Sequence, residues 1–218
     1  MPGTFVPKRK RLAAPQPYHH GDLRRALIDT ALELVTEEQN WTFSLRELAR
    51  RAGVSHQAPY NHFPEKQDLL AAVAVVGFER LRDGMLRAMA GIDAPEALVD
   101  VIGRTYVRLG LENPALYRLM FGAALADAGP GDRPTIARSA GAGARAVLEE
   151  VIERGARSGA FAVSAGSRED QILAAHAFWS AVHGLTMLVI DDLLAPNVSA
   201  EKLIERLLRT QINGLRRA

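Results

Sequence analysis

The segment Ser55-His56-Gln57-Ala58 carries side chains of the kinds that contact base edges in the major groove of DNA. A glutamine amide can form two hydrogen bonds with adenine, and a methyl group can pack against the methyl of thymine. Small residues let the backbone come close to the groove. This chemistry requires that the segment begin a helix which a neighbouring helix holds against the duplex.

The preceding residues predict such a neighbouring helix. Ser44 and Glu47 have the spacing of a capping box, which indicates a helix over residues 44–52. Gly53 suits the left-handed backbone conformation that ends a helix. Val54 is expected to point inward and pin two short helices together, as in a helix-turn-helix.

The second short helix is predicted to run from Ser55 to Phe63, with Ser55 as its cap. Pro59 limits how this helix can form, since proline costs about 3 kcal/mol in a helix interior and little in a first turn. We therefore expect the helix to start late, or to include Pro59 in its first turn.

A second group of polar side chains lies on a long apolar stretch near the C-terminus. His176, Trp179 and His183 recur at spacings of three and four, which places them near one face of a helix. Two interpretations are open: this face contacts a ligand in an apolar pocket, or its rings are satisfied inside the core. The candidate pocket residues are Tyr106, Tyr117, Phe121, His176, Trp179, His183 and Met187.

Composition excludes several classes of site. The 218 residues include no cysteine, so no disulfide, thiolate metal site or cysteine nucleophile can form. No carboxylate stands at ligand spacing to both histidines of the apolar stretch, so we expect neither a metal nor a cofactor. The longest apolar runs are too short to span a bilayer, and we expect a cytoplasmic protein.

Charge is distributed unevenly along the chain. Residues 1–64 hold 9 basic and 6 acidic side chains, whereas residues 65–218 hold 18 and 19. A basic excess at the end that carries the helix-turn-helix pattern favours contact with nucleic acid.

Apolar periodicity predicts an all-α fold of about nine helices and no strand pair. We expect a disordered basic arm over 1–17, a helix-turn-helix domain over 18–66 with a fourth, linking helix to about 90, and a regulatory and dimerisation domain over 91–218. In the last of these, capping residues predict helices that begin after Asp93, Ser167 and Ser199.

The run from Phe43 to Ser55, together with Tyr60-Asn61-His62-Phe63, Lys66 and Leu69-Leu70, resembles the DNA-binding signature of the TetR family. By this resemblance Arg46 reaches the DNA, His56 and Gln57 face bases, and phosphates are held by other side chains. The implied DNA-binding set is Ser44, Arg46, Ser55, His56, Gln57, Ala58, Tyr60, His62 and Lys66.

A finer resemblance concerns one TetR subgroup. Residues 18–23 and the series Trp179-Ser180-Ala181-Val182-His183-Gly184 resemble the motifs of a subgroup whose C-terminal domain carries a Trp…His-Gly pattern.

The resemblance implies a transcriptional regulator, most often a repressor, and not an enzyme. Such a protein binds a palindromic double-stranded DNA operator as a homodimer, pairing through its last two helices, here about 168–194 and 199–216. A small-molecule effector of unknown identity would release it, and no membrane is involved. The alternatives are a ligand-independent DNA-binding or scaffolding protein, or an enzyme, for which no catalytic constellation is visible.

Overall fold

The computed structural model describes residues 20–122 and 133–216. These ranges form eight α-helices and one short 3-10 helix, which are α1 His20–Glu38, α2 Leu45–Arg51, η1 Pro59–Asn61, α3 Lys66–Met89, α4 Pro95–Glu112, α5 Pro114–Phe121, α6 Arg133–Ser158, α7 Arg168–Ile190 and α8 Ala200–Leu215. The all-α prediction is confirmed. The predicted basic arm over 1–17 lies outside the described residues.

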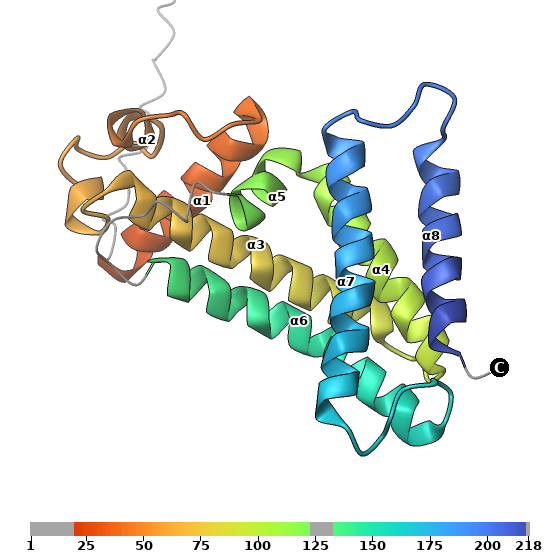
Figure 1. Cartoon of the computed structure of the whole chain (residues 1–218). Helices are drawn as coiled ribbons and strands as arrows, with labels where there is room; N and C mark the ends of the chain where they lie inside the picture. The colour runs from red at the N-terminus through yellow and green to blue at the C-terminus, as the bar shows by residue number, and fades with distance from the viewer. Residues whose placement is uncertain (1–19, 123–132, 217–218) are drawn as a thin grey trace, which may run out of the picture.

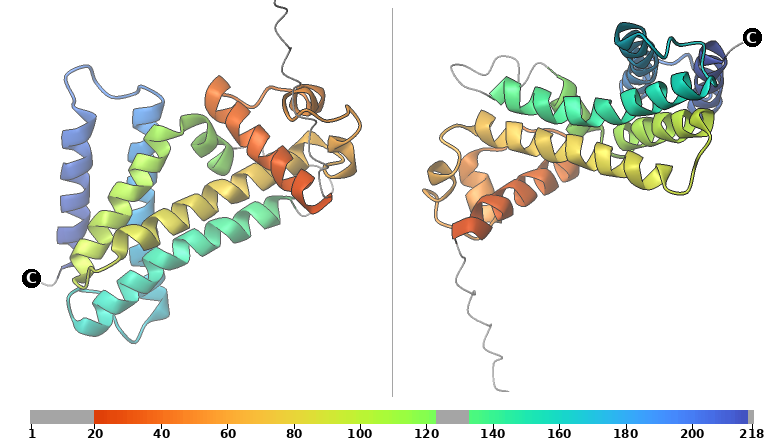
Figure 2. Two further views of the ribbon diagram at one scale, coloured as in Figure 1. Left: turned by 180° about the vertical axis from the view of Figure 1, so that it is seen from behind. Right: turned by 90° about the horizontal axis from the view of Figure 1, so that it is seen from below.

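The helices form two parts that share α3. At one end α1, α2 and η1 gather around the start of α3, and at the other end α7 and α8 lie side by side (Figure 1). Helix α3 runs between the two ends with α6 packed along it, as both views of Figure 2 show. Helix α3 also packs against α1, α4 and α5, so it connects the helix-turn-helix to the rest of the chain.

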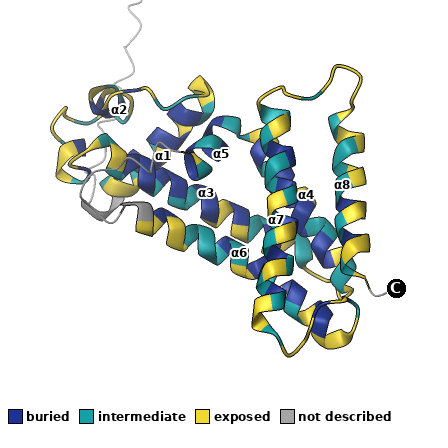
Figure 3. Ribbon diagram, viewed as in Figure 1, coloured by how far each residue is buried: buried dark blue, intermediate teal, exposed yellow. Residues whose placement is uncertain are grey.

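One hydrophobic core extends through both parts. It runs from Leu27 in α1 to Ile212 in α8 and includes residues of every α-helix. Helix α3 is buried over much of its length (Figure 3) and contributes Leu69, Val73 and Phe78, among others. Because burial of apolar area is the main favourable term in folding, the two parts stabilise each other.

Three serines cap helices as the sequence predicts. The hydroxyls of Ser44, Ser167 and Ser199 each accept a hydrogen bond from the backbone N–H three residues on, over 3.1, 3.2 and 3.3 Å. Each bond satisfies one of the donors that the first turn of a helix leaves unpaired.

The prediction that Asp93 caps α4 is wrong. Ala94 occupies the N-cap position and makes no side-chain hydrogen bond. The Asp93 carboxylate instead lies 3.2 Å from the Arg154 guanidinium, which also donates to the Asp93 carbonyl over 2.9 Å. The helix begins at Pro95, one residue later than a cap at Asp93 would require, and the Asp93 carboxylate pairs with a cation of α6 instead.

The second helix of the helix-turn-helix is much shorter than predicted. Only Pro59–Asn61 is helical, and it is a 3-10 helix. The backbone N–H groups of Ala58, Tyr60, Asn61 and His62 each bond to the carbonyl three residues earlier, over 3.0 to 3.3 Å. Pro59 has no N–H with which to close an α-helical bond to Ser55, so the segment adopts the tighter turn.

Helix α7 ends at Ile190 and not at residue 194 as expected. Arg118 of α5 donates to the Ile190 carbonyl over 2.6 Å and to the Asp191 carboxylate over 2.6 and 3.0 Å. Asp192 then adopts φ 53°, which turns the chain away from the helix axis.

Helix α7 is the one helix in the described ranges whose length and hydropathy would allow it to cross a membrane. It packs against α4, α6 and α8. We therefore interpret its apolar composition as serving contacts between helices.

A close contact between α6 and the following turn predicts that one added methyl group lowers the free energy of unfolding. A Cβ on Gly155 would lie 2.0 Å from the fully buried ring of Phe161, whereas one on Gly143 of the same helix would meet nothing within 4 Å. Gly155→Ala should lower the free energy of unfolding by about 1–3 kcal/mol through overpacking. Gly143→Ala should leave it unchanged or raise it by up to about 1 kcal/mol. Chemical denaturation measures both, and equal effects would contradict the packing.

Candidate functional site

The predicted DNA-contacting residues lie on α2, on the turn around η1 and at the start of α3. Most of their side chains are exposed, namely Ser44, Arg46, Ser55, His56, Gln57 and Tyr60. The remaining three, Ala58, His62 and Lys66, are half-buried. Because the turn at 56–58 lies before the 3-10 helix, His56 and Gln57 project from a turn and not from the first turn of an α-helix.

Charge in this region is partly neutralised by ion pairs. Glu47 accepts two hydrogen bonds from Arg50, which lower the pKa of the Glu47 carboxyl. Arg51 pairs with Glu37 of α1. Arg46 makes no salt bridge with another residue of the described ranges, so its charge can be directed to an outside partner.

Lys66 is held in place by an aromatic ring. Its Nζ lies 5.0 Å from the centroid of the Phe43 ring, a distance typical of a cation–π contact. Burial lowers the pKa of Lys66. Lys66 is the first residue of α3, so its ammonium lies near backbone N–H groups that also favour an anion.

A cavity of about 450 Å³ lies within the second part of the fold. It is lined from α3, α4, α5, α6 and α7, mostly by apolar residues that include Phe78, Leu81, Met85, Ile102, Met120, Ala144, Leu148, Phe178 and Val182. Its volume falls within the range of about 300–1,000 Å³ that small-molecule sites occupy. The charged residues among the described lining are Arg138 and Arg145.

The structure brings some of the predicted pocket residues to this cavity. Tyr106, Phe121 and Trp179 line it. His176, Tyr117, His183 and Met187 are not part of its described lining.

The four residues outside the lining have other surroundings. The His176 ring lies 2.9 Å from the Ile172 carbonyl of its own helix, and Met187 packs against the core. Tyr117 is fully buried, and His183 is half-buried in contact with it. Sequence reasoning missed Arg145, because a basic residue on a long polar helix carries no signal that it faces a cavity.

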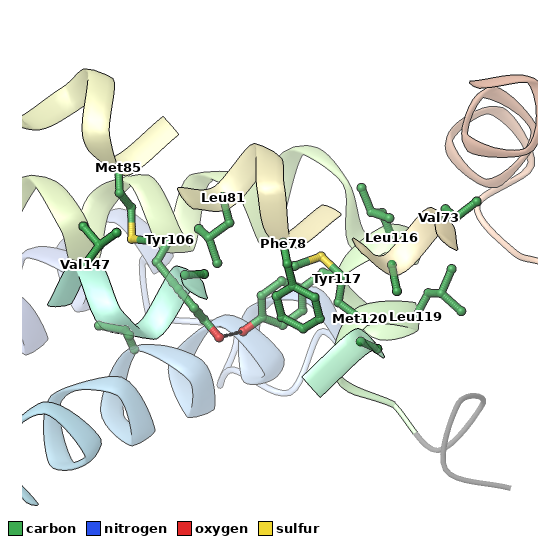
Figure 4. Packing of buried hydrophobic residues seen from close by; sticks show 14 of the residues in the cluster. Val73, Phe78, Leu81, Met85, Tyr106, Leu116, Tyr117, Leu119, Met120 and Val147 are labelled. Carbon is green, nitrogen blue, oxygen red and sulfur yellow. Dashed lines mark hydrogen bonds between the residues drawn. The ribbon is translucent and has the colours of Figure 1, made fainter. Parts of the chain in front are cut away.

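Tyr106, Tyr117, Trp179 and His183 form a hydrogen-bonded cluster beside the cavity. The Tyr117 hydroxyl lies 2.9 Å from that of Tyr106 (Figure 4) and 2.7 Å from His183 Nδ1, and the Tyr106 hydroxyl lies 2.9 Å from the same nitrogen. Trp179 Nε1 donates to the Tyr106 hydroxyl over 3.0 Å. The cluster links α4, α5 and α7.

The surroundings of the cluster favour the neutral forms of its histidine and tyrosines. His183 Nδ1 accepts a hydrogen bond from a tyrosine hydroxyl, so we assign the ring proton to Nε2. Burial lowers the pKa of His183, raises that of Tyr106 to about 12 and raises that of Tyr117. Tyrosine hydroxyls thus satisfy the Nδ1 of His183, and the ring is connected to the cavity through Tyr106.

The lowered pKa of His183 predicts a pH effect on stability. Because the unfolded histidine has a pKa of about 6.5, the unfolded chain binds more protons below that value than the folded one does. The free energy of unfolding should therefore fall as the pH drops from about 7.5 to about 5.5, and it should fall less in His183→Gln.

His176→Gln, on the same helix but outside the cluster, is the matched control and should keep the wild-type slope. Chemical denaturation at several pH values gives all three slopes. Identical slopes for wild type and His183→Gln would show that the cluster does not hold His183 neutral.

The sequence and the fold match those of known regulatory proteins. Residues 27–73 match the family described as bacterial regulatory proteins, tetR family, and residues 99–211 match the tetracyclin repressor-like C-terminal domain. A solved structure of a protein with unknown function from Rhodococcus sp. RHA1 has a TM-score of 0.76 and 29% identity, covering 93% of this chain and 100% of that one.

Two curated relatives match a shorter part of the chain. The HTH-type transcriptional regulator BetI of Rhizobium meliloti (strain 1021) is 32% identical over 85 residues, which are 39% of this chain and 42% of that protein. An uncharacterized HTH-type transcriptional regulator of Haemophilus influenzae is 33% identical over 99 residues, which are 44% of this chain and 48% of that protein. The chain thus matches less than half the length of either relative, whereas the C-terminal family match alone spans just over half of this chain. The chain belongs to the TetR family of bacterial regulatory proteins.

Proposed function

We propose that the protein is a cytoplasmic transcriptional regulator that binds a palindromic DNA operator as a homodimer and is released by a small-molecule effector. The observation that carries the proposal is the cavity, which shares one hydrophobic core with the helix-turn-helix. Within this proposal the resemblance to the Trp…His-Gly subgroup stays a prediction.

Base contacts are assigned to the exposed polar side chains of α2 and of the turn. Arg46 has no salt bridge within the described ranges, and His56 and Gln57 are exposed in the turn before η1. An arginine or a glutamine that bonds a base twice contributes about 1–3 kcal/mol of discrimination. Ser55 and Ala58 flank this pair and let the turn approach the groove.

Phosphate contacts are assigned to Ser44, Tyr60, His62 and Lys66. Ser44 already accepts a backbone hydrogen bond, and its hydroxyl proton can still be donated to a phosphate oxygen. Lys66 carries its charge next to the N-terminal donors of α3. These contacts would fix the orientation of the turn on the duplex without reading sequence.

A second copy of the chain is proposed to pair along α7 and α8. On α7 the apolar or small residues Leu173, Ala177, Ser180, Gly184 and Leu188 recur at helical spacing on one side. Leu173 and Leu188 are 61% and 43% exposed, and a Cβ on Gly184 would meet nothing within 4 Å. Exposed apolar side chains beside small residues fit a helix of a partner subunit.

Helix α5 provides a route from the cavity to the DNA-contacting surface. Met120 and Phe121 of α5 line the cavity, and the same helix packs against α1. Arg118 and Tyr117 tie α5 to α7 through Asp191 and His183. An occupant of the cavity that fits one position of α5 better than another would bias both the helix-turn-helix and the proposed dimer face.

The cavity favours a ligand-responsive regulator over the ligand-independent alternative. A ligand-independent DNA-binding or scaffolding protein has no need of an apolar cavity of this size, because apolar surface left unpacked forgoes the stabilisation that burial provides. The enzyme alternative has no support, since the chain belongs to a family of regulatory proteins.

The DNA contacts are tested by Gln57→Ala and Lys66→Ala. Selection from a random DNA pool should show that Gln57→Ala relaxes preference at particular positions, whereas Lys66→Ala keeps the preference. Lys66→Ala should weaken binding to all sequences and reduce the slope of log affinity against log salt by about one unit.

Arg157→Ala, on α6, removes one positive charge far from the helix-turn-helix in sequence and outside the proposed dimer face, and it should change neither property. A changed sequence preference in Lys66→Ala, or an unchanged one in Gln57→Ala, would overturn these assignments.

The dimer is tested by Gly184→Glu, which places a charge on the proposed interface in open space on the protomer. Light scattering should give a dimer for the wild type and a monomer for the variant, and operator binding should be lost because a single turn reads too few bases. Gly143→Glu is the matched control, since a side chain there also meets nothing within 4 Å. A dimeric Gly184→Glu variant, or a monomeric wild type, would contradict the interface.

A further inference from the structure

Arg145 of α6 faces the cavity with part of its hydrogen-bonding capacity unused. It lines the cavity, and its Cζ lies 5.9 Å from the centroid of the Trp179 ring, which also lines it. Its Nε is buried and has no hydrogen-bond partner. Because this nitrogen is closed off from solvent and lies beside Glu149, an occupant of the cavity would meet the terminal nitrogens of the guanidinium.

The charge of Arg145 is incompletely balanced by its neighbours. Glu149 Oε1 lies 3.4 Å from Arg145 Nε, within ion-pair range but without hydrogen-bond geometry. The other oxygen of Glu149 binds Arg168, so one carboxylate is shared by two guanidinium groups. Glu149 itself is not part of the described cavity lining, in which no acidic residue occurs.

The rest of the lining favours an occupant whose main part is apolar. Phe78, Leu81, Ile102 and Phe178 present hydrocarbon surface to the cavity. The two neutral polar groups, the Tyr106 hydroxyl and the Trp179 N–H, are bonded to each other and to their cluster. They can remain satisfied without a polar group on the occupant.

We infer that the cavity takes an amphipathic organic anion, with its apolar body against α3, α4 and α7 and its anionic group on the Arg145 guanidinium. This inference rests on the proposed effector role of the cavity. A planar guanidinium can bind a carboxylate, sulfonate or phosphate through two N–H groups, and the Trp179 ring lies close enough for a cation–π contact with it. The Arg145 side chain is 33% exposed, so the anion would keep part of its hydration.

Two fluorescent probes that share one ring system test the charge preference. Anilinonaphthalenesulfonate carries a sulfonate, and phenylnaphthylamine is the uncharged parent; both brighten in an apolar site. Arg145→Gln should weaken binding of the sulfonated probe about tenfold or more and leave the neutral probe unchanged. Arg145→Lys should retain part of the preference for the sulfonated probe because it keeps the charge.

Arg157→Gln is the matched control, since Arg157 lies on the same helix, pairs with Glu153 and is not in the described lining. It should leave the affinity for both probes unchanged. If Arg145→Gln unfolds, Arg145→Met, which keeps an unbranched side chain of similar length, repeats the comparison. A fall of equal size for both probes, or no fall for either, would overturn the inference and leave the effector cavity standing. Failure of the wild type to bind either probe would overturn the effector cavity as well.

Discussion

The burial of α3 is the constraint on which the rest of the structure depends. Its first turns close the core of the helix-turn-helix, and the same helix packs against α4, α5 and α6 of the second part. Neither part can bury its apolar residues without this helix, so a displacement in one part is resisted by packing in the other. Under the proposed function, this shared core couples the cavity in the second part to side chains such as Gln57.

The apolar void is bordered by a polar network that is nearly complete. Tyr106, Tyr117, Trp179 and His183 satisfy one another, and the pKa values of the three titratable members are shifted toward their neutral forms. Arg145 differs because its Nε has no hydrogen-bond partner. An occupant would therefore contact neutral polar groups on one side of the cavity and the Arg145 guanidinium on another. It would also contact α5 through Met120 and Phe121.

The sequence predicts the features that depend on local chemistry and fails where distant residues compete. The hydroxyls of Ser44, Ser167 and Ser199 cap helices as expected, because a serine and the next turn are enough to make the bond. Asp93 does not cap, because α4 begins at Pro95 and leaves Ala94 in the N-cap position, while the Asp93 carboxylate pairs with Arg154 of α6. Pro59 indicated that an α-helix could not run regularly through this segment, but the resulting 3-10 turn depends on how the whole segment packs. The approach of Arg145 to the cavity depends on the packing of α6 against α7, which no single stretch of sequence encodes.

Under the proposed function, filling the cavity moves the DNA-contacting surfaces of a dimer relative to each other. The chain has no cysteine, so Gln67→Cys at the start of α3 accepts a single spin label on an exposed position. Pulsed electron–electron double resonance then measures the distance between the two labels of the proposed dimer, with and without saturating anilinonaphthalenesulfonate. The distance distribution should shift when the probe binds, and operator affinity should fall at the same time. An operator affinity that falls while the distance distribution stays the same would contradict this expectation.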